Sequence, residues 1–388
     1  MITVVEALDI LNNVSIRKNE IVLPLHLSNN YILAEEVRSP INMPPFRQSA
    51  MDGFAIQINN DNSYLIIGEI KAGDAANLKI EEGQAIKIFT GAKVPDDANA
   101  VIQIEKCSVI GQLLSLETVP KLNQNIRSIG EQILMNDIAL PKDTFLNPAA
   151  IGFLAGLGIT EVKVYKKPSV GIIVTGNELI QPGKPLTEGK VYESNGVMLQ
   201  MALSGLTSEV NFYRVFDEYQ ATKEAIQEAI DLHDVVLISG GISVGDYDFV
   251  YESLQEIGVE TFFYKVNQKP GKPLFAGKFK DKFIFALPGN PAASLTCFYI
   301  YVKPLITKIF GFPSDSTQNN QAILKEDLVV NNTRSQFLKA KLEDGQVSIL
   351  SHQNSSMLNS FSIANALIFI KDGDYTLKKG DKVDIYHI

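Results

Sequence analysis

Short apolar runs alternate with amphipathic stretches between residues 169 and 311. Three of these runs have the length of buried strands: Ser169 to Thr175, Val235 to Ser239 and Phe283 to Leu287. Three other stretches have helical spacing of their apolar positions: Gln220 to Leu232, Phe249 to Ile257 and Asn290 to Phe310. Strands that alternate with helices indicate βαβ units, so the pattern predicts an α/β domain with a parallel sheet.

The pattern on both sides of this region is mostly that of β structure. Residues 41–145 have no helical period and are interrupted by Pro, Gly and Asn, with strands expected at Tyr64 to Ile70, Ala85 to Thr90, Ala100 to Ile104 and Gln112 to Thr118. After a polar stretch from residue 314, strands are expected at Gln336 to Leu342, Gln346 to Leu350, Ala366 to Lys371 and Lys382 to His387. Glu343-Asp344-Gly345 between the first two indicates a hairpin. The sequence thus predicts a β insertion and a small C-terminal β domain.

Two further helices are predicted from their first residues. Thr3 and Glu6 have the spacing of a capping box at the start of an amphipathic stretch. Asn147 and Pro148 have the residue types of a helix cap and a first helical position, for a helix within Leu146 to Ile159.

Composition and charge restrict the class of protein. A chain of 388 residues with 45% hydrophobic and 20% charged residues is typical of a folded protein with more than one core. The net charge of −9 disfavours nucleic acids and anionic membranes as partners. The two cysteines, Cys107 and Cys297, have no Cys or His at metal-ligand spacing, and the N-terminus has no basic and apolar signal pattern. We therefore expect a cytoplasmic protein.

Candidate chemical groups follow the predicted strands, and open parallel sheets bind ligands at the edge where their strands end. Thr175-Gly176-Asn177-Glu178-Leu179 offers the carboxylate of Glu178, although an ordinary polar turn explains this loop equally well. The glycine-rich loop from Ser239 to Asp248 precedes a helix, and backbone amides in such a loop bind oxyanions. Asp248 either binds a magnesium ion beside that anion or caps the next helix.

Basic residues and two further loops extend this pattern. Lys265, Lys269 and Lys272 lie close together, and the prolines and glycine of Lys269-Pro270-Gly271-Lys272-Pro273 restrict the backbone between them, which suits a phosphate-bearing ligand. Pro288-Gly289-Asn290-Pro291 ends the third strand, with Asn290 as the expected cap of the next helix. In the β insertion, Asp52 and Thr90 lie in tight loops that, taken alone, are more often turns than catalytic sites.

Eight short motifs between residues 49 and 365 together resemble one known family. They are SAMDGFA, TGAKVP, IRSIGE, TGNEL, SGGISVGDYD, KPGKP, PGNP and SSMLNSFSIAN. In this order they are similar to those of the molybdopterin molybdenumtransferases, the bacterial counterparts of the gephyrin E domain. The resemblance implies an elongated homodimer whose α/β subdomain is similar to molybdopterin adenylyltransferase. The implied subdomains are residues 1–20 with 168–312 (α/β, molybdopterin-binding), 21–40 with 146–167 (connecting), 41–145 (mostly β insertion) and 313–388 (small, β-barrel-like).

The same resemblance implies a reaction and its residues. Adenylylated molybdopterin and molybdate are the substrates, Mg²⁺ assists cleavage of the pyrophosphate link, and AMP and molybdenum cofactor are the products. The residues at matching catalytic positions are Asp52, Thr90, Glu178, Asp217, Lys265 and Lys269, of which Asp52 and Thr90 act on the partner chain's α/β site. The residues at matching cofactor-binding positions are Gly240, Gly241, Ser243, Gly245, Lys272, Pro288, Asn290, Pro291, Lys339 and Ser355. Glu178 and Asp248 are the implied metal ligands.

Several residues depart from the family pattern. Gln132 and Asn177 replace acidic residues, and Lys339 replaces an arginine. A lysine cannot form a two-point clamp on an oxyanion, so we expect weaker molybdate affinity than in a typical relative. The alternative to a transferase is a non-catalytic carrier of molybdopterin nucleotide or a scaffold, but retention of Asp52, Glu178 and Asp248 favours the enzyme. Molybdopterin adenylyltransferase and molybdoenzyme-maturation proteins are candidate partners.

Overall fold

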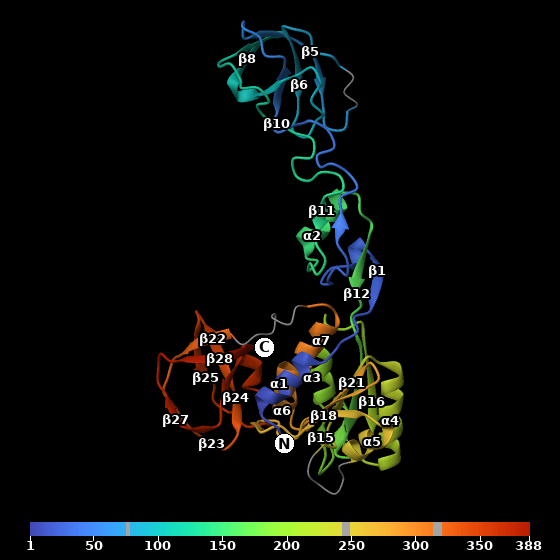
Figure 1. Cartoon of the computed structure of the whole chain (residues 1–388). Coiled ribbons are helices and arrows are strands. Elements are labelled where there is room, and N and C mark those ends of the chain that lie inside the picture. Colours follow the sequence, from blue (N-terminus) through green and yellow to red (C-terminus); the bar gives the residue numbers. More distant parts are fainter. Residues whose placement is uncertain (75–77, 243–248, 313–319) are drawn as a thin grey trace. The chain divides into compact units, whose positions relative to one another are not determined.

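The computed structural model describes residues 1–74, 78–242, 249–312 and 320–388. The chain divides into two compact units (Figure 1). The first unit contains Met1–Ile21, Asn30–Ala34 and Val164–Ile388, and the second contains Val22–Asn29 and Glu35–Lys163. None of the helices in the described ranges is long and apolar enough to cross a membrane. The α/β region and the C-terminal β region thus share one unit, and the β insertion belongs to the other.

A six-stranded sheet forms the centre of the α/β region. In spatial order its strands are β16 (Glu209–Val215), β13 (Ser169–Thr175), β17 (Val235–Ser239), β21 (Lys282–Leu287), β20 (Phe275–Phe279) and β18 (Glu260–Tyr264). The first four run parallel, and β20 and β18 are antiparallel to their neighbours. Every residue of β13 and β17 is buried, because helices cover both faces of the sheet (Figure 1). The predicted α/β fold is confirmed.

Two apolar clusters join the helices to the two faces of this sheet. One contains residues of α4 (Tyr219–Leu232) and α5 (Phe249–Ile257). The other contains residues of α1 (Val4–Asn13), α3 (Asn195–Ala202), α6 (Pro291–Cys297), the π-helical turn η3 (Phe298–Val302) and α7 (Lys303–Ile309). The single helix predicted from Asn290 to Phe310 is therefore interrupted, since Pro304 has no amide hydrogen to donate to the preceding turn. Helix α1 begins at the predicted capping box, where the Glu6 N–H donates to Thr3 Oγ1 at 3.2 Å.

The C-terminal β region is a closed barrel of five strands, as the barrel-like prediction requires. They are β24 (Ser335–Glu343), β25 (Gln346–Ile349), β22 (Asn320–Leu324), β28 (Lys382–His387) and β26 (Ala366–Ile370), and β26 pairs back with β24. Short β19 (Gln268–Lys269), from the α/β region, adds to the edge of β24. The remaining elements of this unit are β23 (Leu328–Asn332) paired with β27 (Gly373–Leu377), β14 (Leu179–Ile180) paired with β15 (Val191–Tyr192), and the 3₁₀ turn η5 (Phe361–Ile363).

The second unit contains the mostly β insertion. Its main sheet has the order β7 (Ala100–Gln103), β4 (Gly53–Ile56), β6 (Gln84–Ile88), β5 (Ser63–Ile70), β9 (Leu113–Leu116) and β8 (Cys107–Ile110). Two-stranded pairs are β3 (Gln48–Ser49) with β10 (Ile126–Arg127) and β2 (Val37–Arg38) with β11 (Ile138–Leu140). A third pair, β1 (Glu20–Pro24) with β12 (Glu161–Tyr165), has residues in both units. The helical elements are η1 (Leu25–Leu27), η2 (Ile104–Lys106) and α2 (Pro148–Gly156). Asn147 caps α2 as predicted, because its Oδ1 accepts from the Ala150 N–H at 2.9 Å.

Gly53, at the start of β4, is a position where only glycine fits. A Cβ at this residue would lie 1.7 Å from the carbonyl oxygen of Ile102 on the neighbouring strand. We therefore expect Gly53→Ala to lower the free energy of unfolding of the second unit by about 3 kcal/mol, since overpacking forces the strands apart. Urea unfolding followed by circular dichroism measures this change. Gly152→Ala is the control, since its Cβ would meet no atom within 4 Å, and an equal loss in both variants would contradict the explanation.

Candidate active site

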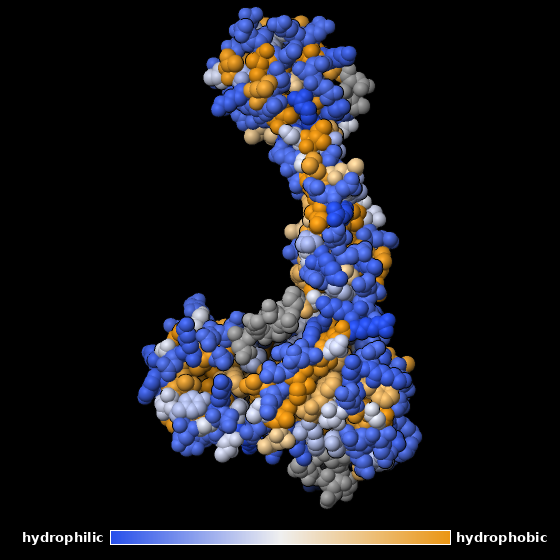
Figure 2. All heavy atoms as spheres, viewed as in Figure 1, coloured by the Kyte–Doolittle hydropathy of each residue, from blue (hydrophilic) through white to orange (hydrophobic). Residues whose placement is uncertain are grey.

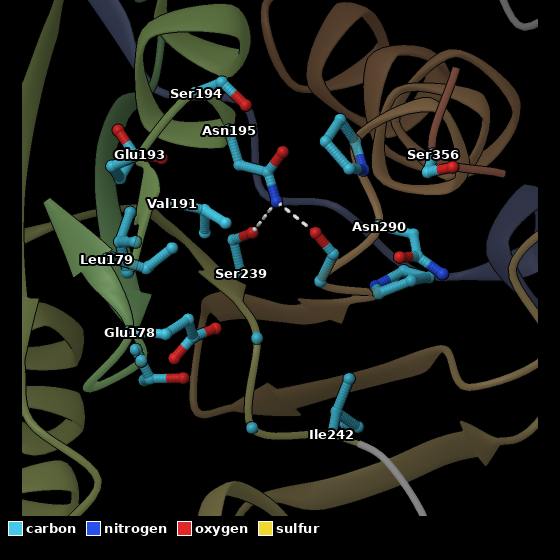
Figure 3. A pocket seen from close by; sticks show the side chains of 18 of the residues that line it. Glu178, Leu179, Val191, Glu193, Ser194, Asn195, Ser239, Ile242, Asn290 and Ser356 are labelled. Carbon is cyan, nitrogen blue, oxygen red and sulfur yellow. Dashed lines mark hydrogen bonds between the residues drawn. The ribbon is translucent and has the colours of Figure 1, made fainter. Parts of the chain in front are cut away.

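A cavity of about 740 Å³ lies at the carboxyl ends of the parallel strands (Figure 3). The loops after β13, β16, β17 and β21 and the start of α3 form its wall. Predicted site residues in this wall are Glu178, Asp217, Gly240, Gly241, Pro288, Asn290 and Pro291. These residues are far apart in the sequence, but parallel strands bring their carboxyl ends to one edge of a sheet. We call this the first cavity.

Asn177 connects the loop after β13 to the loop after β16. The Asn177 N–H donates to Asp217 Oδ2 at 3.0 Å, and the Asp217 N–H donates to Asn177 Oδ1 at 3.1 Å. This reciprocal pair requires an oxygen on residue 177 but no charge, so asparagine suffices here. Gly176 has a φ of 145°, and a Cβ there would lie 2.8 Å from Glu178 Oε2. Glycine at this position therefore leaves room for the Glu178 carboxylate in the cavity wall.

The glycine loop after β17 packs directly on the end of β13. Gly240 and Gly241 have positive φ values of 93° and 63°. A Cβ on Gly240 would lie 2.8 Å from the Thr175 carbonyl oxygen, and one on Gly241 would lie 3.0 Å from Thr175 Oγ1. Glycine is required at both positions, because side chains would separate the two loops. The next predicted residues of this loop, Ser243, Gly245 and Asp248, lie outside the described residues.

Asn195, at the start of α3, is a site residue that the sequence analysis missed. Its Nδ2 donates to Ser239 Oγ and to the Gly289 carbonyl oxygen, both at 2.8 Å (Figure 3). Asn195 therefore holds the loops after β17 and β21 together along the cavity wall. Asn195 could have been recognised only from its position at the start of a helix. The sequence did not predict α3, because this helix is short and the polar residue Asn195 is buried in its first turn, which obscures the apolar spacing.

A second cavity, of about 410 Å³, adjoins the first and shares Pro273, Pro288, Asn290 and Ser356 with it. Its wall contains Lys269, Lys272 and Arg334, and none of the described residues that line it has a carboxylate. Asn290 occupies the cap position of α6, but its Nδ2 donates to Ser355 Oγ at 3.2 Å instead of capping the helix. The wall is therefore cationic and rich in polar donors. Arg334 is a second residue that sequence reasoning did not include among the candidate ligands.

Buried groups fix the backbone of the lysine loop. Gln268 is fully buried, and its Nε2 donates to the carbonyl oxygens of Pro270 at 3.0 Å and Gly271 at 3.2 Å. Its Oε1 accepts from the hydroxyl of Tyr301. A Cβ on Gly271 would lie 2.5 Å from Cys297 Sγ, so the loop lies tightly against α6. The restricted backbone expected from the prolines and glycine thus also depends on tertiary hydrogen bonds.

Lys265 and Lys339 line neither cavity. Lys265 Nζ lies 4.5 Å from the centre of the Tyr264 ring. Lys339 is only 3% exposed, burial lowers its pKa, and its Nζ donates to the carbonyl oxygens of His352, Asn354 and Met357 at 2.8, 3.4 and 3.0 Å. The Lys339 ammonium therefore donates to backbone carbonyl groups of residues 352–357, and a role for Lys339 in cofactor binding stays a prediction.

Asp52 and Thr90 form a pair within the second unit. The Thr90 N–H and hydroxyl both donate to Asp52 Oδ1 at 2.7 Å. These hydrogen bonds, led by the one from the backbone, hold the pKa of the Asp52 carboxyl below its usual value. Both side chains are exposed. The two loops thus present one oriented carboxylate, with its second oxygen open to a ligand.

The donor set of the first cavity suits a magnesium ion that also contacts substrate phosphates. Glu178 and Asp217 both line this cavity. Mg²⁺ is commonly bound through one or two protein carboxylates together with phosphate oxygens and water. No cluster of three or more His, Cys, Asp or Glu side chains suited to a metal occurs among the described residues. Glu178, Glu193 and Asp217 are therefore the described groups of this cavity that could hold such an ion.

Three family models match successive parts of the chain. The MoeA N-terminal region (domain I and II) matches residues 2–158. A probable molybdopterin binding domain matches residues 171–308, which contain most of the six-stranded sheet and the strand-end loops of the first cavity. The MoeA C-terminal region (domain IV) matches residues 321–388, which form the barrel.

Full-length relatives agree with these matches. The molybdopterin molybdenumtransferases of Staphylococcus aureus strain MSSA476 and Staphylococcus epidermidis strain ATCC 12228 are 32% and 33% identical to this chain, over 99% of its length and 95% of theirs. The crystal structure of the molybdopterin biosynthesis moeA protein from Pyrococcus horikoshii OT3 matches with a TM-score of 0.83 and 29% identity, covering both chains completely. A molybdenum cofactor biosynthesis protein from Pyrococcus furiosus shares the fold, with a TM-score of 0.61 and 20% identity. This chain belongs to the molybdopterin molybdenumtransferase (MoeA) family.

Proposed function

We propose that this chain inserts molybdenum from molybdate into adenylylated molybdopterin, releasing AMP and forming molybdenum cofactor. The observation that carries this proposal is the junction of two chemically different cavities. The first offers the carboxylates of Glu178, Glu193 and Asp217 and strand-end backbone, and the second offers cations and polar donors without a described carboxylate. Because they share Pro288 and Asn290, ligands bound in the two cavities would meet there.

The second cavity suits molybdate, which is a dianion. Arg334 can donate two parallel hydrogen bonds to an oxyanion, and Lys269 and Lys272 add point charges. Ser355 and Asn290 supply uncharged donors at the boundary with the first cavity. This set can neutralise a dianion without a contribution from Lys339, which does not line the cavity.

The first cavity suits the pyrophosphate link of the nucleotide substrate. Among the three described carboxylates of this cavity, Glu178, Glu193 and Asp217, the predicted site residues Glu178 and Asp217 would hold Mg²⁺, and the predicted ligand Asp248 lies outside the described residues. When bound, the ion would neutralise charge on the phosphate oxygens as the phosphoanhydride bond breaks. Lys269 and Lys272, in the adjoining wall, would stabilise the negative charge that develops as AMP leaves.

The proposal includes a homodimer in which each active site uses both chains. The Asp52–Thr90 pair belongs to the second unit, whereas every residue that lines the two cavities belongs to the first. Figure 2 shows hydrophobic residues gathered over α1 and α3, and Val5, Val197 and Met201 on these helices are 52%, 52% and 62% exposed. Such a surface suits a second copy of the chain. We also propose that the protein is cytoplasmic. It would receive its substrate from an adenylyltransferase and pass its product to molybdoenzyme-maturation proteins.

The carrier or scaffold alternative has no observation in its favour. The full-length relatives are named as transferases. A carrier would also have no need of the oriented Asp52 carboxylate in addition to Glu178 and Asp217.

AMP release by the native protein tests the proposal. We expect release from adenylylated molybdopterin that is stimulated by molybdate and abolished by EDTA, with recovery on addition of Mg²⁺. Chromatographic measurement of AMP checks this result, and Asp281→Asn, an exposed carboxylate outside both cavities, should behave as the native protein. Tight binding of the nucleotide without AMP release at any molybdate concentration would restore the carrier alternative.

A further inference from the structure

The segment from His352 to Met357 forms part of the wall of both cavities. Gln353, Asn354 and Ser355 line the second cavity, and Ser356 lines both. The segment has no helix or strand of its own. Two hydrogen bonds join it to α6 and its cap: Asn290 Nδ2 donates to Ser355 Oγ, and the Ala293 N–H donates to the Ser355 carbonyl oxygen at 3.2 Å. Its conformation must therefore be set largely from the barrel.

Lys339, on β24, directs its ammonium group into this segment. Three backbone carbonyl oxygens of the segment, those of His352, Asn354 and Met357, converge on Nζ. No described carboxylate lies within ion-pair distance of this ammonium. These carbonyl groups are thus the polar partners that offset the cost of burying its charge.

The backbone of Lys339 is connected to the same segment through Gln353. The Lys339 N–H donates to Gln353 Oε1 at 2.9 Å, and Gln353 Nε2 donates back to the Lys339 carbonyl oxygen at 2.9 Å. Gln353 Nε2 also donates to the Leu350 carbonyl oxygen at 2.7 Å. The N–H, the carbonyl and the ammonium of one residue therefore all bind the segment that carries the cavity-wall side chains.

We propose that Lys339 is a positioning residue for the active site, an internal cation around which residues 352–357 fold so that Asn354 and Ser355 face the second cavity. It acts through those residues and does not touch a substrate. The proposal rests on the proposed function only in taking the second cavity as the molybdate site. The folding of the segment around an ammonium group holds whatever that cavity binds.

Replacement of the ammonium by an apolar group should release the segment. In Lys339→Met the chain length is nearly kept, but the three carbonyl oxygens lose the ammonium group on which they converge. The donors that remain are the Ser360 hydroxyl, for the His352 and Met357 carbonyl oxygens, and the Met357 N–H, for that of Asn354. An arginine carries more donors than a lysine and can serve the same carbonyl groups. Lys339→Arg should therefore retain the segment, and it should not improve molybdate affinity as it would if residue 339 bound the oxyanion directly.

The test combines hydrogen exchange with molybdate titration in the full-length protein. For Lys339→Met we expect faster amide exchange at Met357, whose N–H donates to Asn354, with exchange in β28 unchanged. We also expect the half-saturating molybdate concentration for AMP release to rise roughly tenfold with little change in kcat, and Lys339→Arg to stay within about threefold of native. Lys341→Met, a partly exposed lysine on the same strand, is the matched control.

Two results would overturn this role. Native exchange at Met357 together with unchanged half-saturation in Lys339→Met would show that the ammonium is dispensable. Weakened molybdate affinity with native exchange at Met357 would assign Lys339 a direct contact with the anion. If Lys339→Met does not fold, Gln353→Leu removes the other hydrogen bonds between Lys339 and this segment. This variant should raise both the amide exchange rate at Met357 and the half-saturating molybdate concentration. A native protein that releases no AMP would count against the proposed function, whereas calorimetry with molybdate and the exchange measurement would still decide this inference.

Discussion

Mixing an Asp52→Asn variant with a Glu178→Gln variant should restore AMP release that neither variant shows alone. Glu178 lines the first cavity in the first unit, and Asp52 lies with Thr90 in the second unit. If the second unit of one chain completes the cavity of its partner, a heterodimer of these variants contains one fully native site and one doubly altered site. Random exchange should thus return about a quarter of the native activity, because half of the dimers are mixed and each has one working site.

A second mixture provides the control for this experiment. Asp52→Asn and Thr90→Ala both alter the second unit, so their mixed dimers contain no native site and should remain inactive. Native mass spectrometry would verify that subunits exchange in both mixtures. Recovery in neither mixture, despite exchange, would show that Asp52 and Glu178 do not contribute to one site across two chains.

The central strands were predictable because a strand that is buried on both faces of a sheet is a continuous run of apolar residues. β13 and β17 are continuous apolar runs, and the structure has them at the predicted residues. The edge strand β16 was missed, since most of its residues from Glu209 to Val215 are exposed and include polar side chains. A strand of this kind is specified by pairing with its neighbour, and its own apolar pattern is weak.

The strand-end loops were predictable for a related reason. Once parallel strands are recognised, topology brings Glu178, Gly240 and Asn290 to one edge without knowledge of any side-chain contact. The partners of polar side chains were not predictable in this way. Lys339 lies on β24 and Arg334 directly precedes this strand, yet Lys339 is buried against carbonyl groups and Arg334 lines the second cavity. Only tertiary packing distinguishes a cation that binds a ligand from one that supports the wall.

Replacement of Arg334 by methionine should cause a large loss of molybdate affinity, because Arg334 is a cation that lines the second cavity. The guanidinium is the one group in the described lining of the second cavity able to make a two-point contact with an oxyanion. We expect the half-saturating molybdate concentration to rise roughly 10- to 100-fold, the range for losing charged hydrogen bonds in a partly enclosed site. Lys272→Gln should have a smaller effect that decreases further at high salt, because its exposed ammonium is screened.

The control for charge alone is Arg17→Met, which removes an exposed arginine from a different cavity, one lined also by Pro168 and Asp234. Both variants change the net charge from −9 to −10, so the contribution of net charge to the long-range interaction with molybdate changes equally in the two proteins. A large rise in the half-saturating molybdate concentration for Arg334→Met alone would therefore reflect direct contact at the second cavity.

Equal and small changes in both variants would mean that molybdate binds elsewhere. The cationic wall would then be better explained by the phosphates of the nucleotide. Calorimetric titration of molybdate and of AMP into each variant separates these two outcomes, since only the first predicts that AMP affinity stays native when Arg334 is removed.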